Sequence, residues 1–173
     1  MTSRAPTPSS STSHDSAIER ALDDVRAARR SVGKRIDDDT PEVLRRRAQV
    51  MIDDLDAIEC DLLLAVAGNR AARAGTVADV RRSLGEVDVM SHRWFAQLRG
   101  SAAEVEVGLT NHSIVDTQLD KHETESDLAL DRAIEALRTE PDLARARHIA
   151  ARAIERVRDR IRVATITLRE RAG

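Results

Sequence analysis

Three residues in the second half of the chain have types and spacing that suit a metal site. His112 and Asp116 are four positions apart, which places both on one face of an α-helix, and Glu123 follows on that face two turns later. Imidazole and carboxylate groups together are ligands for Zn, Mn or Fe. We therefore predict His112, Asp116 and Glu123 as candidate metal ligands, the alternative being a solvated polar face of the same helix.

Other catalytic constellations are missing from the sequence. Diiron helical bundles need a glutamate three positions before a histidine, and none of the histidines has one. Carboxylates cluster within residues 53–61 and 116–127, and two acidic helices that face each other can hold Mg²⁺ in a nucleotide pyrophosphohydrolase. Cys60 is the only cysteine and has no motif around it, which disfavours a thiol nucleophile. The sequence predicts no cofactor, and it identifies no small-molecule substrate.

Two groups of residues are candidates for binding a partner. Trp94 falls on an apolar stripe, where core packing is the simpler role, and Phe95 flanks that stripe, where an aromatic side chain can anchor a partner helix. The last segment is rich in arginine and includes Arg152, Arg156 and Arg160 at helical spacing. Such a face can release counterions from DNA or RNA. Nucleic-acid binding is disfavoured because the chain has a net charge of −2 and no aromatic residues are interleaved with these arginines.

The positions of all these residues depend on helices. Apolar residues recur at alternating spacings of three and four, most cleanly along residues 44–65 and 77–98. Only an α-helix brings such positions onto one stripe, and a seven-residue period keeps that stripe facing a neighbouring helix. The first stripe contains Leu44, Ala48, Met51, Leu55, Ile58, Leu62 and Ala65. The sequence therefore predicts an all-α fold, an antiparallel bundle of about five long helices with coiled-coil-like heptad packing.

Composition shifts and capping signals set the expected boundaries. Residues 1–15 are rich in Ser, Thr and Pro and predict a disordered tail, followed by one helical bundle domain over residues 16–173. Helices are expected over about 16–36, 41–67, 76–100, 101–140 and 141–173. The signals behind these limits are Gly68 with Asn69 as a C-terminal cap, Thr76 with Asp79 as a capping pair, and Ser101 with Glu104 as a capping box.

The apolar period fails once, on the fourth expected helix. Polar residues occupy much of its stripe between His112 and Ser126. Three explanations stay open: the helix projects beyond the bundle, it breaks near residues 108–111, or the polar positions meet in an internal site. This interruption is where we look first for a site.

Composition is consistent with a helical interaction protein. Charged residues make up 34% of the chain and aromatic residues 1%, so the core must be aliphatic. After a neutral start, successive helical segments alternate between acidic and basic, which favours antiparallel pairing of neighbours. A single cysteine fits the reducing cytoplasm. No apolar run reaches the roughly 20 residues needed to span a membrane.

Together these features predict a non-enzymatic helical interaction or assembly protein that binds a protein partner or itself in the cytoplasm. One alternative is a small helical enzyme or metal-binding bundle that uses the polar stripe of the fourth helix. A further alternative is non-specific nucleic-acid binding through the arginine-rich last helix.

Overall fold

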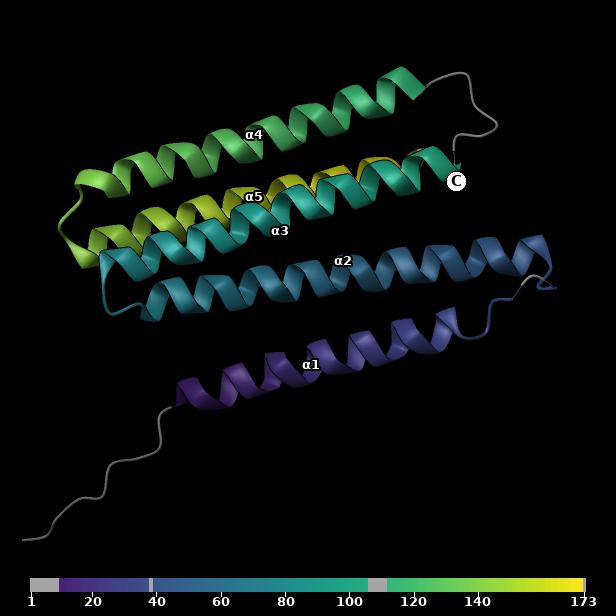
Figure 1. The fold of residues 1–173 in the computed structure, drawn as a ribbon, viewed down its shortest axis with the longest axis horizontal. Coiled ribbons are helices and arrows are strands. Elements are labelled where there is room, and N and C mark those ends of the chain that lie inside the picture. Colours follow the sequence, from purple (N-terminus) through teal and green to yellow (C-terminus); the bar gives the residue numbers. More distant parts are fainter. Residues whose placement is uncertain (1–9, 38, 106–111, 173) are drawn as a thin grey trace, which may run out of the picture. The chain divides into compact units, whose positions relative to one another are not determined.

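The fold is all-α. The computed structural model describes residues 10–37, 39–105 and 112–172, and within those ranges it contains five helices and no strand (Figure 1). The helices are α1 (Ser10–Gly33), α2 (Glu42–Arg73), α3 (Val77–Val105), α4 (His112–Thr139) and α5 (Leu143–Ala172). The prediction of about five long helices is confirmed.

The chain divides into two compact units, and the division falls within α2. Residues 1–62 form the first unit and residues 63–173 the second. The first unit holds α1 and the N-terminal part of α2, and the second holds the rest of α2 with α3, α4 and α5. The sequence predicts a single bundle domain over residues 16–173 instead.

In the first unit, α1 and α2 are joined by two ion pairs. Arg26 Nε lies 2.7 Å from Glu59 Oε1, and Arg29 Nε lies 2.5 Å from Asp56 Oδ1. As the residue number rises along α1 it falls along α2, so the two helices are antiparallel. These contacts also assign one face of α2, the one that contains Asp56 and Glu59, to α1.

In the second unit, α3, α4 and α5 pack against one another as a three-helix bundle. Their apolar stripes are buried as expected from the sequence. The buried side chains include Val80, Leu84, Val87, Leu98, Leu119, Leu130, Leu137, Val157 and Ile161. The core is therefore largely aliphatic, as the scarcity of aromatic residues predicted, and it also contains Trp94 and Phe95.

Ion pairs fix the register of this bundle. Arg99 Nη2 lies 2.7 Å from Asp120 Oδ1, and His92 Nε2 lies 3.6 Å from Asp127 Oδ1, so α3 and α4 are antiparallel. Arg160 Nη1 lies 2.8 Å from Glu125 Oε2, which joins α5 to α4. In each pair α4 supplies the carboxylate and its neighbour the basic group, in line with the alternating charge of the segments.

The expected end of α2 at Gly68 is wrong, because the helix continues to Arg73. No described residue has a positive φ, so Gly68 does not adopt a left-handed cap. Alanine is the strongest helix former, and Ala67 and Ala71 bury their side chains here, which favours continuation over termination. A Cβ built on Gly68 would meet Ile154 Cγ2 at 4.0 Å, which places this turn of α2 close to α5.

The capping prediction for α3 is confirmed, and that for α4 is wrong. Asp79 N donates to Thr76 Oγ1 at 3.1 Å, and this hydroxyl donates to Asp79 Oδ2 at 2.7 Å. Ser101 lies inside α3, which extends to Val105, because Gly100 alone costs only about 1 kcal/mol and two alanines follow Ser101. The break expected near residues 108–111 lies outside the described residues, and α4 begins at His112.

The first helix starts earlier than expected. It begins at Ser10, so residues 10–15 are helical although the sequence analysis assigned them to a disordered tail. Proline is the residue that most strongly opposes a helix, and none follows Pro8 in this segment until Pro41. The rest of the predicted tail, residues 1–9, lies outside the described residues.

Candidate interaction surface

Two of the three predicted metal ligands on α4, Asp116 and Glu123, have described side chains. Asp116 is exposed, and Glu123 accepts a short hydrogen bond from Arg99 Nη2 of α3. The side chain of His112 lies outside the described residues. The buried face of α4 passes through Leu119, His122 and Ser126, and Glu123 is one position away from it, about 100° around the helix. The Glu123 carboxylate therefore faces α3, where it forms an ion pair with the guanidinium of Arg99.

Part of the polar interruption of α4 does point inward. His122 and Ser126 are both buried, and Ser126 Oγ donates to the His122 carbonyl oxygen at 2.9 Å. His122 Nδ1 has no hydrogen-bond partner among the described residues. Burial lowers the pKa of His122, and the nearby positive charge of Arg160 lowers it further. The sequence left three explanations for the polar interruption of this helix. For His122 and Ser126, the one that applies is polar side chains inside the bundle.

Trp94 and Phe95 are core residues. Trp94 is 6% exposed and Phe95 is 0% exposed, so Phe95 is not available at the surface as the sequence analysis expected for a partner anchor. The physical reason is that α3 packs against both α4 and α5, which widens its buried face beyond a single stripe. Trp94 Nε1 and Ser91 Oγ are buried and lack hydrogen-bond partners among the described residues.

The arginines predicted to form a binding face on α5 are in different environments. Arg152 and Arg156 are exposed, whereas Arg160 is half-buried and paired with Glu125. The exposed carboxylates Glu155 and Asp159 are interleaved with them. This arrangement produces a mixed surface rather than a continuous basic stripe.

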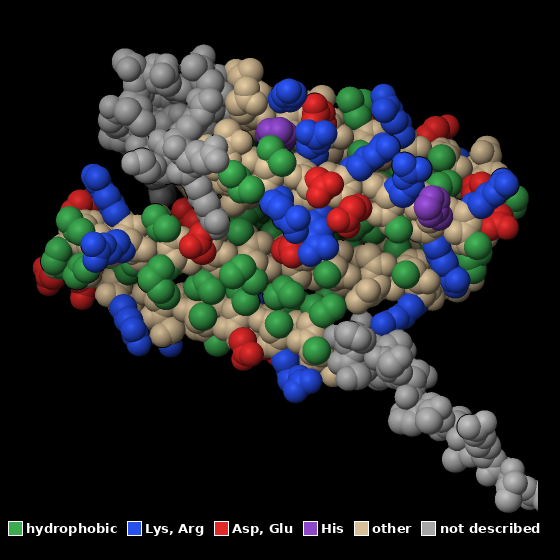
Figure 2. Space-filling model, turned by 180° about the vertical axis from the view of Figure 1, so that it is seen from behind, with side chains coloured by type: hydrophobic (Ala, Val, Ile, Leu, Met, Phe, Trp, Pro, Cys, Tyr) green, Lys and Arg blue, Asp and Glu red, His purple; other side chains and the backbone are tan. Residues whose placement is uncertain are grey.

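The largest departure from the sequence analysis concerns α2. The stripe with the most regular heptad spacing was expected to be buried, but Leu44 is 51%, Met51 53% and Ile58 48% exposed. Val43 and Val50 beside them are also exposed. These five account for more than half of the exposed large apolar side chains among the described residues. We call Val43, Leu44, Val50, Met51 and Ile58 the α2 stripe. Figure 2 shows hydrophobic side chains in green on one face of the molecule.

Helical phase explains why the α2 stripe is uncovered. Met51 and Cys60 are nine positions apart, which is about 180° around a helix, and Cys60 is 6% exposed. Ile58 is two positions from Asp56, about 160° around the helix, and Asp56 is on the face that α1 binds. Among the described residues of the first unit, the α2 stripe is therefore on the side of the helix away from α1. Arg47 and Asp54 lie between its members in the sequence.

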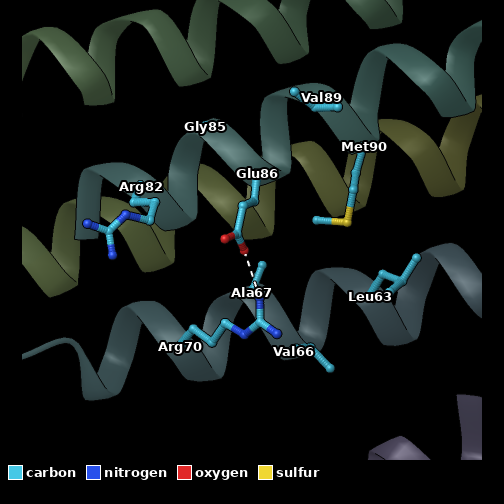
Figure 3. A pocket seen from close by; sticks show the side chains of 9 residues that line it. All are labelled: Leu63, Val66, Ala67, Arg70, Arg82, Gly85, Glu86, Val89 and Met90. Atoms are coloured by element: carbon cyan, nitrogen blue, oxygen red, sulfur yellow. Dashed lines mark hydrogen bonds and ion pairs between the residues drawn. The ribbon is translucent and has the colours of Figure 1, made fainter. Parts of the chain in front are cut away.

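A surface groove of about 550 Å³ lies between the C-terminal part of α2 and the N-terminal part of α3 (Figure 3). Leu63 and Val66 line it from α2, and Val89 and Met90 line it from α3. An ion pair of 2.9 Å between Arg70 Nη1 and Glu86 Oε2 spans it. This ion pair ties the two walls of the groove together.

Among the described residues, no helix combines the length and the apolar character that crossing a membrane requires. Comparison with known proteins found no matching family model, no matching curated protein and no matching solved structure.

Proposed function

We propose that this protein is a non-enzymatic helical assembly protein whose α2 stripe packs against the same stripe of a second copy, with the two α2 helices antiparallel. The observation that carries the proposal is the exposure of Leu44, Met51 and Ile58 on a helix where they recur every seven residues. Apolar residues at this period form the contact line of coiled coils. Uncovered apolar patches of this kind mark protein interaction sites.

The charges within the stripe favour a second copy as the occupant. Arg47 and Asp54 lie on the same face, on either side of Met51. If two α2 helices cross antiparallel with Met51 at the centre, Leu44 of one copy faces Ile58 of the other. Arg47 of each copy is then beside Asp54 of the other, which makes two reciprocal ion pairs. A parallel pair would instead place Arg47 against Arg47, and like charges in register are destabilising.

The distribution of charge along α2 supports the same direction. The arginines of residues 45–47 lie near the start of the helix, and the aspartates of residues 53–56 follow about two turns later. When two α2 helices run in opposite directions, the basic stretch of one lies beside the acidic stretch of the other. This attraction favours both the association of the two copies and the antiparallel register. Because a single cysteine cannot form a disulfide within the chain, we propose that assembly takes place in the reducing cytoplasm.

The two alternatives gain no specific support at their predicted residues. Asp116 is exposed, and Glu123 pairs with Arg99 of α3. Arg160 pairs with Glu125, and the exposed carboxylates Glu155 and Asp159 lie near Arg152 and Arg156 along α5. Self-association through the α2 stripe is the function that the described surface supports best.

The proposal is tested by sedimentation equilibrium of the full chain over a wide concentration range. We expect the wild-type chain to dimerise and Met51→Glu to remain monomeric, because a charge at the centre of the contact must be desolvated. Leu128→Glu, which changes a similarly exposed leucine on α4, is the matched control and should dimerise like the wild type. A wild-type chain that stays monomeric at all concentrations overturns the proposal, as does equal weakening by both variants.

A further inference from the structure

Besides the residues on which the sequence analysis focused, one cluster joins a histidine to carboxylates from two helices. Asp88 and His92 are four positions apart on α3, and Asp127 approaches them from α4. One ligand atom from each of the three side chains lies within 4.8 Å of the others. Among the described residues this is the group of histidine and carboxylates that comes close enough to share an ion.

The hydrogen bonding of His92 leaves a ring nitrogen available. His92 Nδ1 lies 3.0 Å from the Asp88 carbonyl oxygen, which can only accept, so Nδ1 carries the proton. In the neutral ring the lone pair is then on Nε2, the nitrogen 3.6 Å from Asp127 Oδ1. A histidine that ligates a metal ordinarily donates its other N–H to a carbonyl or carboxylate in this way, which fixes the tautomer.

The environment of Asp127 also favours a cation. Its Oδ1 is buried and has no hydrogen-bond partner among the described residues. Burial raises the pKa of Asp127, and the nearby carboxylates Glu123, Asp88 and Asp131 raise it further, while His92 lowers it. Negative charge is thus concentrated here without a matching arginine or lysine in contact with Asp127 in the described interactions. A divalent cation would neutralise both ligating carboxylates at once.

The separations suit a transition metal. Zinc bonds to nitrogen and oxygen are about 2.0–2.2 Å, so tetrahedral ligand atoms are roughly 3.4 Å apart. The 3.6 Å between His92 Nε2 and Asp127 Oδ1 is close to this value. Asp88 Oδ1 lies 3.5 Å from the other ring nitrogen, His92 Nδ1; its carboxylate is 42% exposed, so it can rotate toward an ion held by His92 Nε2 and Asp127.

We propose that Asp88, His92 and Asp127 form a three-ligand site for a divalent transition-metal ion of the zinc class, which bridges α3 to α4. The imidazole selects for such an ion, because Mg²⁺ and Ca²⁺ prefer oxygen ligands alone. Three protein ligands leave a coordination position for water or another small ligand. The site is independent of the α2 stripe, since all three residues belong to the second unit.

The test is isothermal titration calorimetry of the full chain with Zn²⁺ at pH 7.5, alone and with millimolar Mg²⁺ present. We expect one site per chain, unchanged by Mg²⁺, and weakened at least tenfold in both His92→Ala and Asp127→Asn. His148→Ala, which removes an exposed histidine of α5, is the matched control and should bind as the wild type does. Because all of these residues are at least partly exposed, circular dichroism should show the same helix content in each variant.

Three outcomes would overturn this site. Binding that survives His92→Ala would assign the ion to other residues. Equal loss in His148→Ala would indicate general surface histidine binding. Displacement of Zn²⁺ by millimolar Mg²⁺ would show that the carboxylates attract any divalent cation and that His92 does not select the ion.

Discussion

Arg29 Nε lies 2.5 Å from Asp56 Oδ1, so an exposed guanidinium on α1 neutralises a carboxylate whose side chain is only 6% exposed on α2. Asp56 and Met51 are five positions apart, about 140° around the helix. The face of α2 that binds α1 is therefore separate from the α2 stripe. A second copy can occupy the stripe without displacing α1.

The Arg29–Asp56 pair should show strong coupling. Arg29→Met removes the Arg29 cation from beside a nearly buried carboxylate, and we expect it to cost about 1–2 kcal/mol, less than a fully buried pair because Arg29 is half exposed. Asp56→Leu in the same chain removes the carboxylate as well and should recover much of that loss. The free energies of unfolding in urea, combined as a double-mutant cycle, measure the coupling. Additive losses would contradict it.

Two glycines within helices should be replaceable with a gain in stability. Alanine at Gly68 would meet Ile154 Cγ2 at an ordinary contact distance, and alanine at Gly85 would meet nothing within 4 Å. Each replacement should raise the free energy of unfolding by about 0.5–1 kcal/mol, because glycine is the weaker helix former. Gly68→Leu should lower it, since the larger side chain must displace Ile154. Thermal melting distinguishes these results, and destabilisation by Gly68→Ala would show that the helices are closer than described.

His122 should make the second unit sensitive to acid. Burial lowers its pKa, so the unfolded chain takes up a proton before the folded one does. The stability it contributes is therefore complete above the unfolded pKa of about 6.5 and is lost as pH falls from there through the folded pKa. His122→Gln should flatten this loss between about pH 7 and pH 5. An unchanged pH profile in the variant would refute the assignment.

His92 should change the pH dependence of stability in the direction opposite to His122, so the two histidines can be compared within one protein. A hydrogen bond to the Asp88 carbonyl oxygen raises its pKa, with further contributions from the nearby carboxylates Asp127 and Glu123. Its stabilising effect is complete below the unfolded pKa and is lost as pH rises through the folded pKa. His92→Gln in metal-free buffer should therefore reduce stability more at pH 5 than at pH 8.

Cys60 should be unreactive in the folded chain. Burial, with the charges of Asp61 and Glu59, raises the pKa of its thiol to about 12, so almost no thiolate is present at neutral pH. A thiol-specific disulfide reagent should label Cys60 at least a hundredfold more slowly in buffer than in concentrated urea. Similar rates in the two conditions would contradict the described burial.

The sequence predicts which apolar stripes are buried correctly in the second unit and wrongly in the first. The stripes of α3 and α5 are buried where their spacing placed them, because α3, α4 and α5 each have two neighbours to cover them. The same spacing on α2 predicted burial wrongly, since a heptad indicates that a helix face is suited to a partner and not that the partner is in the same chain. Charged residues between the apolar positions do not separate the two cases by themselves: Arg47 and Asp54 interrupt the stripe of α2, but Arg147 also falls in the stripe of α5, where it is half-buried and donates to the Ala74 carbonyl oxygen.

The spacing along one helix also did not identify the buried His122 of α4 or the cluster of Asp88, His92 and Asp127. Extending one register along α4 placed Asp116, Glu123 and Ser126 on the stripe. Ser126 is buried as that register predicts, but Asp116 is exposed, and beside Glu123 the buried position is His122. The cluster of Asp88, His92 and Asp127 combines residues from two helices, and the sequence contains only the four-residue spacing of the first two. The approach of Asp127 depends on the register between α3 and α4, which no single-helix pattern encodes.

The most direct measurement of the central claim is a charge exchange within the α2 stripe, followed by sedimentation equilibrium. Arg47→Asp and Asp54→Arg should each weaken dimerisation, because each places like charges together twice in an antiparallel pair. The double variant Arg47→Asp/Asp54→Arg should restore the wild-type dimer, since the reciprocal pairs re-form with their signs reversed. A double variant that dimerises no better than the weaker single variant would contradict antiparallel pairing of two α2 stripes.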